Sequence, residues 1–143
     1  MAGVVSAALS ATRFELSIGG QQAVLFAELR GLTSALELPA FISAPSEMQF
    51  DVATGRQLPP CVVLKRRLTP SIELAAWHEL AIRDLASARR SCTLTMLGAK
   101  GDAVARYLLT EAWPSKLEIG ALDSGILTET VTLACRLLQR VSV

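Results

Sequence analysis

Apolar and polar residues alternate with a period of two along most of this chain, and only one stretch departs from that pattern with helical spacing. The alternation runs through Phe14–Ile18, Val62–Leu68 and Cys92–Met96. It is typical of strands that bury one face. The glycines at Gly19-Gly20 and Gly98–Gly101 supply the turns that follow the first and last of these segments. The chain is therefore predicted to consist mainly of antiparallel hairpins.

The exception begins after Thr69-Pro70, where apolar residues recur at three- and four-residue spacing. The Thr69 hydroxyl is suited to cap the first turn of a helix, and proline is tolerated in that turn. We expect one helix from this point to Ala88, with a single buried stripe. The stripe contains Leu74, Trp77, Ala81, Leu85 and Ala88.

Further strands are expected at Ala23–Leu29, Ala103–Thr110, Lys116–Ile119 and Ile126–Leu138, with Ala112-Trp113-Pro114 ending the second of these. Several hairpins around one helix predict a mainly β (α+β) fold. We expect an antiparallel β-barrel or sandwich with one flanking helix.

The length of 143 residues predicts a single domain covering residues 1–143. Within it, residues 1–12 are expected to form an N-terminal arm. Residues 43–60, a stretch with weak periodicity and three prolines, are expected to form a long loop. The expected structural core includes Phe14, Leu64, Trp77, Trp113 and Leu133.

Composition argues against several classes of partner. A net charge of +1 with scattered basic residues gives no concentrated patch for nucleic acid or an anionic membrane. The chain is 51% hydrophobic, yet its longest charge-free runs are too short to span a bilayer. Such a surplus of apolar residues suggests that part of the surface is buried against other chains.

Three widely spaced cysteines, Cys61, Cys92 and Cys135, fit neither a zinc site nor a disulfide framework, and reduced thiols are expected.

Catalytic chemistry is not expected. His78 is the only histidine, and no nucleophile motif accompanies it. The Gly98–Gly101 turn lacks the Lys-Ser/Thr of a phosphate-binding loop. Aromatic rings on an apolar stripe are more often core than ligand-stacking groups, so Trp77 and Trp113 are assigned to the core. We therefore expect no catalytic residue, no cofactor and no metal ion.

Several short motifs follow one another in a specific order. They are Phe14–Gly20, Phe26–Leu32, Leu58-Pro59 with Val63–Arg66, Leu74–Trp77, Ala112-Trp113-Pro114 and Glu129–Ala134. Together they cover nearly the whole chain and resemble the contractile phage tail tube family. That family is typified by the T-even phage tail tube and also contains the inner tube proteins of extracellular contractile injection systems.

The resemblance implies a structural subunit that assembles, with no active site. Subunits would form hexameric rings whose sheets join around a lumen, and the rings would stack into a tube. The loop of residues 43–60 would contact other subunits, with Glu47, Met48, Gln49, Phe50 and Arg56 as candidates. The implied partners are sheath, baseplate or spike, and cap proteins, and cargo would be held in the lumen. Assembly would take place in the bacterial cytoplasm, within a phage-tail-like particle.

The polar face of the last expected strand, Thr128-Thr130-Thr132, is a candidate wall of the lumen or exterior, with ordinary solvent exposure as the alternative. The chain departs from the family pattern at Arg67 and Pro60, where glycine is usual, and at Leu38–Pro45, where a charged glycine-rich loop is expected. These departures leave open a tube-initiating paralogue. Two further alternatives are a type VI secretion ring protein and a monomeric β-barrel binding module.

Overall fold

The computed structural model describes residues 8–20, 23–37 and 56–143. Ten strands and two helices make up this part of the chain. The strands are β1 (Arg13–Ile18), β2 (Ala23–Phe26), β3 (Glu28–Thr33), β4 (Leu36–Glu37), β5 (Arg56–Gln57), β6 (Cys61–Arg67), β7 (Arg90–Leu97), β8 (Ala103–Ala121), β9 (Leu127–Ala134) and β10 (Leu137–Val141), and the helices are α1 (Glu73–Arg83) and α2 (Leu85–Ala88).

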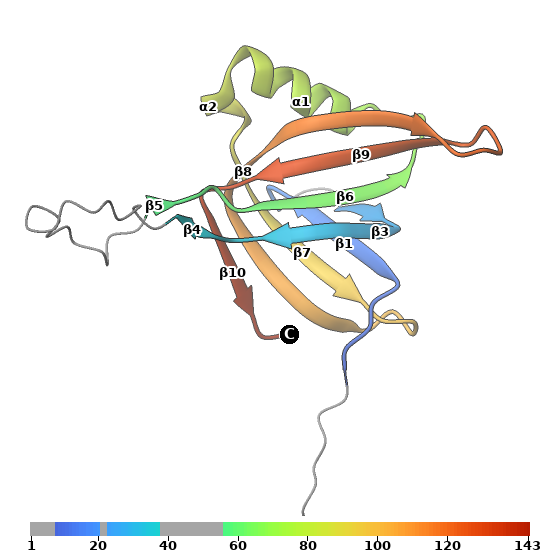
Figure 1. Cartoon of the computed structure of the whole chain (residues 1–143), viewed down its shortest axis with the longest axis horizontal. Helices are drawn as coiled ribbons and strands as arrows, with labels where there is room; N and C mark the ends of the chain where they lie inside the picture. Colours follow the sequence, from blue (N-terminus) through green and yellow to red (C-terminus); the bar gives the residue numbers. More distant parts are fainter. Residues whose placement is uncertain (1–7, 21–22, 38–55) are drawn as a thin grey trace, which may run out of the picture.

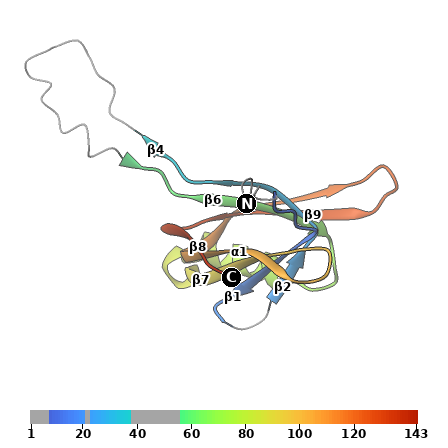
Figure 2. The same cartoon turned by 90° about the horizontal axis from the view of Figure 1, so that it is seen from below.

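Eight of these strands form one antiparallel sheet in the order β2-β1-β7-β8-β9-β6-β3, and β10 also pairs with β8. The sheet folds over along β8, so that it makes two layers (Figures 1 and 2). We call β2, β1, β7, β10 and the first part of β8 the first half-sheet. The second half-sheet contains the last part of β8, β9, β6 and β3. A short ribbon of β4 and β5 extends from the second half-sheet.

The core lies between the two half-sheets. Its largest fully buried side chains include Leu16 and Phe26 from the first half-sheet and Leu64 and Leu133 from the second. Helix α1 packs against β8 and contributes Leu74 and Trp77 to the same cluster. The expected mainly β fold with a flanking helix is therefore confirmed, although the helical part is divided in two.

The helix differs from the expectation at both ends. Thr69 does not cap it: its hydroxyl accepts a hydrogen bond from the Ser71 amide, and α1 begins only at Glu73. The chain leaves helical geometry at Asp84 (φ −153°, ψ 87°), whose side chain then caps α2. Polar residues that bond their own backbone compete with helix continuation, and this explains both departures.

Three expected strand boundaries were wrong. Ala112-Trp113-Pro114 does not end a strand, because β8 continues through it and absorbs the expected strand at Lys116–Ile119. The expected final strand is divided into β9 and β10 at Cys135-Arg136, although both parts run beside β8. The second hairpin strand also bends, at Ala27, where the chain passes from the first half-sheet to the second.

Candidate functional site

Two strand edges of the second half-sheet have no strand partner within the described residues. Strand β3 pairs with β6 on one side only. Strand β8 pairs with β7 as far as Ala112, and from Trp113 to Ala121 it pairs with β9 alone. An open edge presents unpaired backbone N–H and C=O groups to which another chain can add a strand. The two edges lie on opposite sides of the same four-stranded layer.

The second half-sheet has one apolar and one polar face. Its inner face carries the buried residues Val62, Leu64, Val131 and Leu133 toward the core. Its outer face carries the row Glu28, Lys65, Thr130 and Glu118, which are register partners across four strands. Charged and hydroxyl side chains therefore cover the face that points away from the core.

The threonines of the outer face are less accessible than expected. Thr130 is 8% exposed and Thr128 is 7% exposed, whereas Thr132 is half-buried. Thr130 lies between Lys65 and Glu118 in the register, so longer neighbouring side chains flank it. The expectation that water touches all three threonines was wrong for Thr128 and Thr130, and the flanking charged residues form the polar surface instead.

The inner face continues beyond the core as an exposed apolar hairpin. Strands β8 and β9 project past the other strands at one end, as Figures 1 and 2 show. The exposed large apolar side chains of this hairpin are Ile119, Leu122, Ile126 and Leu127. Of these, Ile119 and Leu127 lie on the same face as the buried Val131. Within the described residues, nothing covers this continuation of the core face.

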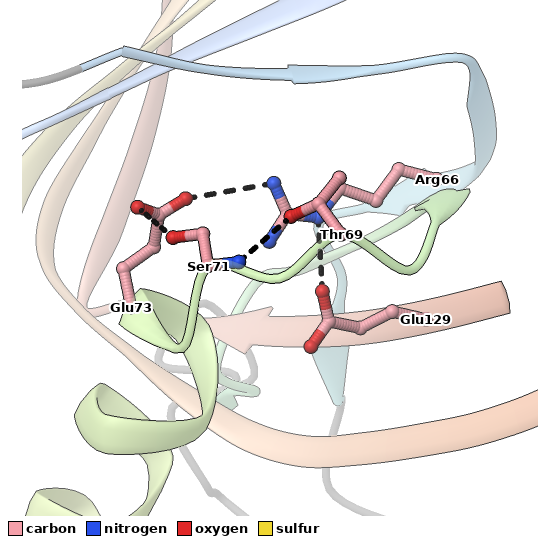
Figure 3. A network of polar contacts seen from close by, with 5 residues as sticks. All are labelled: Arg66, Thr69, Ser71, Glu73 and Glu129. Atoms are coloured by element: carbon pink, nitrogen blue, oxygen red, sulfur yellow. Dashed lines mark hydrogen bonds and ion pairs between the residues drawn. The ribbon is translucent and has the colours of Figure 1, made fainter. Parts of the chain in front are cut away.

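A buried ion-pair network closes the core near the base of this hairpin. Arg66 Nε donates to Glu129 Oε1 at 2.9 Å, and Arg66 Nη1 lies 3.5 Å from Glu73 Oε1. Figure 3 shows Arg66 reaching from β6 toward both carboxylates, one on β9 and one at the start of α1. The guanidinium also lies 5.7 Å from the centre of the Phe26 ring. The network links β6, β9 and α1.

Sequence reasoning missed this network because it considered the charges one element at a time. The signal was present in the strand alternation. Arg66 has the same parity as the buried Leu64, and Glu129 has the same parity as the buried Val131. Opposite charges on the buried faces of two strands are expected to pair, since an isolated charge there is strongly destabilising.

A surface cavity lies at the other end of β9. Its volume is about 320 Å³, and Leu58, Pro59, Arg89, Trp113, Cys135 and Arg136 line it. The Arg89 guanidinium stacks 5.3 Å from the centre of the Trp113 ring. Glu111 forms ion pairs with Arg136 and, at 3.6 Å, with Arg89. The cavity therefore combines an apolar wall with two arginines that share one carboxylate.

The residues expected to form the core lie in different places. Phe14, Leu64, Trp77 and Leu133 are buried. Trp113 is only half-buried and forms part of the cavity wall. The loop candidates Glu47, Met48, Gln49 and Phe50 lie outside the described residues. Arg56 belongs to β5 (Arg56–Gln57), so a short strand occupies part of the range expected to be loop.

The histidine and two of the cysteines are held by packing and hydrogen bonds within the fold. His78 Nδ1 bonds to the Pro114 carbonyl oxygen at 3.0 Å. Burial raises the pKa of Cys92 to about 12 and that of Cys135 to about 11, so both thiols stay protonated at neutral pH.

No cluster of metal-ligating side chains occurs in the part of the chain that the structure describes. The two helices found there are too short and too polar to span a bilayer.

Several solved structures share this fold. A chain in the sheath-tube complex of an extracellular contractile injection system, PVC, superposes with a TM-score of 0.69 and 16% identity, over 97% of this chain and 95% of that one. A chain in the baseplate of the anti-feeding prophage gives a TM-score of 0.65 and 17% identity, over 98% and 99%. Hcp1 from Flavobacterium johnsoniae gives 0.54 and 15%, over 89% and 93%.

No curated protein sequence matches the chain significantly. The family described as T4-like virus tail tube protein gp19 matches residues 10–139, which include every strand and both helices except the last two residues of β10. The matched range therefore contains all four strands of the half-sheet that has the two open edges. The chain belongs to the T4-like virus tail tube protein gp19 family.

Proposed function

We propose that the chain is a structural subunit of the inner tube of a contractile injection system or phage tail. The observation that carries this proposal is the pair of open edges, β3 and β8, on one four-stranded half-sheet. Copies that join through these edges use two different surfaces. Such a head-to-tail contact produces a ring when the rotation between copies closes.

Strand direction supports this joining. Every neighbouring pair in the half-sheet is antiparallel, and the half-sheet has four strands, so β3 and β8 run in opposite directions. A second copy related by rotation in a ring therefore places its β3 antiparallel to the first copy's β8. The antiparallel pattern of the second half-sheet then continues without interruption from copy to copy, and neither of its two edges remains open.

Side chains at the two edges are also compatible. Half-buried Leu29 and Leu32 lie on the inner face of β3, and Leu117 and exposed Ile119 lie on the inner face of β8. Pairing the edges would extend the apolar layer across the junction and cover part of it. On the outer face, Glu28 of β3 and Lys116 of β8 carry opposite charges.

In this arrangement the outer face of the second half-sheet lines the lumen, because the first half-sheet and α1 cover the inner face. The lumen wall would carry Lys65, Lys116 and Glu118 around Thr130. Both signs of charge on one wall suit the passage of varied cargo, since neither sign binds strongly to it. The tube role requires no catalytic residue, and we assign none.

Family membership supports a proposal for the number of copies and the partners. We propose six copies in a ring, stacked rings, and contacts with sheath, baseplate and cap proteins in a particle assembled in the bacterial cytoplasm. Related folds occur in structures of a sheath-tube complex, a baseplate and a tube-terminating cap. A specialised tube-initiating subunit would have the same edges and would differ in its ring-to-ring contacts.

A type VI secretion ring is the second candidate. The similarity to Hcp1 proteins, with TM-scores of 0.54 and 0.58, supports the shared fold. Genes for an injection-system sheath and baseplate beside the gene for this chain would favour the first candidate. A monomeric binding module is less compatible with the structure, because buried leucine, valine and phenylalanine side chains fill the space between the half-sheets.

The test is electron microscopy of the purified chain in negative stain over a concentration series. Hollow rings or tubes of uniform width are expected, and native mass spectrometry would give the number of copies. A monodisperse monomer at every concentration, with or without baseplate components, would contradict the proposed function.

A further inference from the structure

The tip of the β8–β9 hairpin has a defined shape and an unusual composition. The Leu122 amide donates to the Ile126 carbonyl and the Gly125 amide donates to the Leu122 carbonyl, both at 2.8 Å. Gly125 has a φ of 90°, a backbone angle that residues other than glycine rarely adopt. Leu122 and Ile126 are exposed, and Asp123 is the only charged residue from Ile119 to Leu127. The tip is therefore an ordered apolar projection with one negative charge.

The cavity around Trp113 has the complementary properties. Leu58, Pro59 and Trp113 provide apolar wall, and Arg89 and Arg136 provide two positive charges. Glu111 pairs with both arginines, which leaves one positive charge in excess. Arg136 remains well exposed despite this pairing. The cavity, with a volume of about 320 Å³, thus has an apolar wall next to a net positive charge.

The tip and the cavity lie at opposite ends of β9. The strand begins at Leu127, beside the tip, and ends at Ala134, next to Cys135 and Arg136 of the cavity wall. In Figures 1 and 2 the hairpin projects at one end of the second half-sheet, and the β4–β5 ribbon, which leads into Leu58, lies at the other. A tip cannot reach the cavity of its own chain across the length of the strand.

We propose that the β8–β9 tip of one copy inserts into the Trp113 cavity of a second copy in the next ring. This inference rests on the proposed function, because edge-to-edge pairing uses the sides of the strands and leaves the strand ends on the two faces of the ring. A contact between opposite ends of identical copies does not close on itself, so it repeats from ring to ring and builds a tube. Apolar burial supplies the attraction, and Asp123 meeting Arg89 and Arg136 fixes the partner.

The test separates stacking from ring formation. Native protein and the variants Asp123→Lys, Ile126→Asp and Arg136→Glu are imaged under identical conditions, and the tube fraction is measured by sedimentation. Each variant is expected to form rings that no longer stack. Glu79→Lys, which reverses an exposed charge on α1, is the matched control and is expected to form tubes as the native protein does. The double variant Asp123→Lys with Arg136→Glu is expected to recover stacking, because the two charges are exchanged.

Three results would overturn the proposal. In the first, native rings never stack, so the tip does not build a tube. In the second, Asp123→Lys and Ile126→Asp stack as well as the native protein. In the third, the hairpin variants lose stacking but Arg136→Glu keeps it and the double variant shows no recovery, so that another segment occupies the cavity. Absence of rings from native protein is a different outcome, because it contradicts the proposed function itself.

Discussion

Arg66 and Glu129 are 63 residues apart in the chain, and Arg66 Nε meets Glu129 Oε1 at 2.9 Å between β6 and β9. Only 10% of the Arg66 side chain and 3% of the Glu129 side chain are exposed. Both lie on the inner face, two register positions beyond Leu64 and Val131, where the apolar core gives way to the projecting hairpin. The ion pair therefore marks the end of the apolar core. Beyond it, the apolar side chains of the hairpin are exposed.

Removing one partner of this pair should be strongly destabilising. Glu129→Ala would leave the buried Arg66 guanidinium with the longer contact to Glu73 as its remaining ion pair, and about 3–5 kcal/mol of unfolding free energy should be lost. Urea denaturation followed by circular dichroism, at concentrations below ring assembly, measures this change. The double variant Arg66→Met with Glu129→Leu should recover most of the loss, since apolar replacement of a buried pair is often neutral. A single variant as stable as the native protein would contradict the assigned burial.

Trp77 should contribute to stability through both its ring and its indole N–H. The residue is 2% exposed, and its Nε1 donates to the Ala88 carbonyl oxygen at 2.7 Å, which ties α1 to the end of α2. Trp77→Ala should cost about 3–5 kcal/mol of unfolding free energy because it leaves a large cavity. Trp77→Phe keeps most of the ring but leaves a buried carbonyl unpaired, so it should cost about 1–3 kcal/mol. A Trp77→Phe variant as stable as the native protein would show that the hydrogen bond contributes nothing, and equal losses in the two variants would contradict the contribution of the ring.

The sequence predicted the strands more reliably than their ends. Alternation identified β1, β6 and β7 because each buries one face on a single core. It failed at Trp113-Pro114, where proline suggested a strand end. Pro114 is tolerated because, at this position, β8 has lost β7 and pairs only with β9, so a missing N–H need not break a ladder on both sides.

The interacting surfaces could be predicted only in part. The surplus of apolar residues indicated burial against other chains, but it could not show that four of them gather on one hairpin. The cavity was missed for the same reason: Leu58, Trp113 and Arg136 are far apart in sequence and meet only because β8 and β9 run together past the start of β6. Long-range register, which alternation does not encode, decides both features.

Glu111 should be a site of backbone strain. Its φ of 52° is in the left-handed region, at the irregularity where β8 leaves β7. Glu111→Gly and Glu111→Ala remove the same ion pairs with Arg89 and Arg136, so their difference isolates the backbone. The glycine variant should be more stable than the alanine variant by about 1 kcal/mol, because alanine is penalised at positive φ. Thermal unfolding of the two variants side by side measures this, and equal melting temperatures would contradict it.

The buried thiol of Cys92 should make stability fall at alkaline pH. Its pKa is raised from 9.0 to about 12, chiefly because burial disfavours the thiolate. Because the pKa is higher in the folded state, the contribution of the protonated Cys92 thiol to stability is fully present below pH 9, where both states are protonated. It is lost as the pH rises from 9 toward 12, because the unfolded state releases its proton first. At pH 10 the loss should be about 1.4 kcal/mol of unfolding free energy. Urea unfolding at pH 8 and pH 10 should show a smaller decline for Cys92→Ala than for the native protein. Identical declines would contradict the raised pKa.

Ring formation should depend on the β8 edge and not on apolar exposure in general. Ile119 is 56% exposed on the inner face of β8, whereas Leu25 is 49% exposed on β2 of the first half-sheet. Ile119→Asp places a charge in the apolar layer that the β3–β8 junction would continue, so it should give monomers where the native protein gives rings. Leu25→Asp adds the same charge at similar exposure but away from the β3 and β8 edges, and it should leave the rings intact. Native mass spectrometry at matched concentration distinguishes the two. Rings from both variants, or monomers from both, would show that the junction is not where the open edges place it.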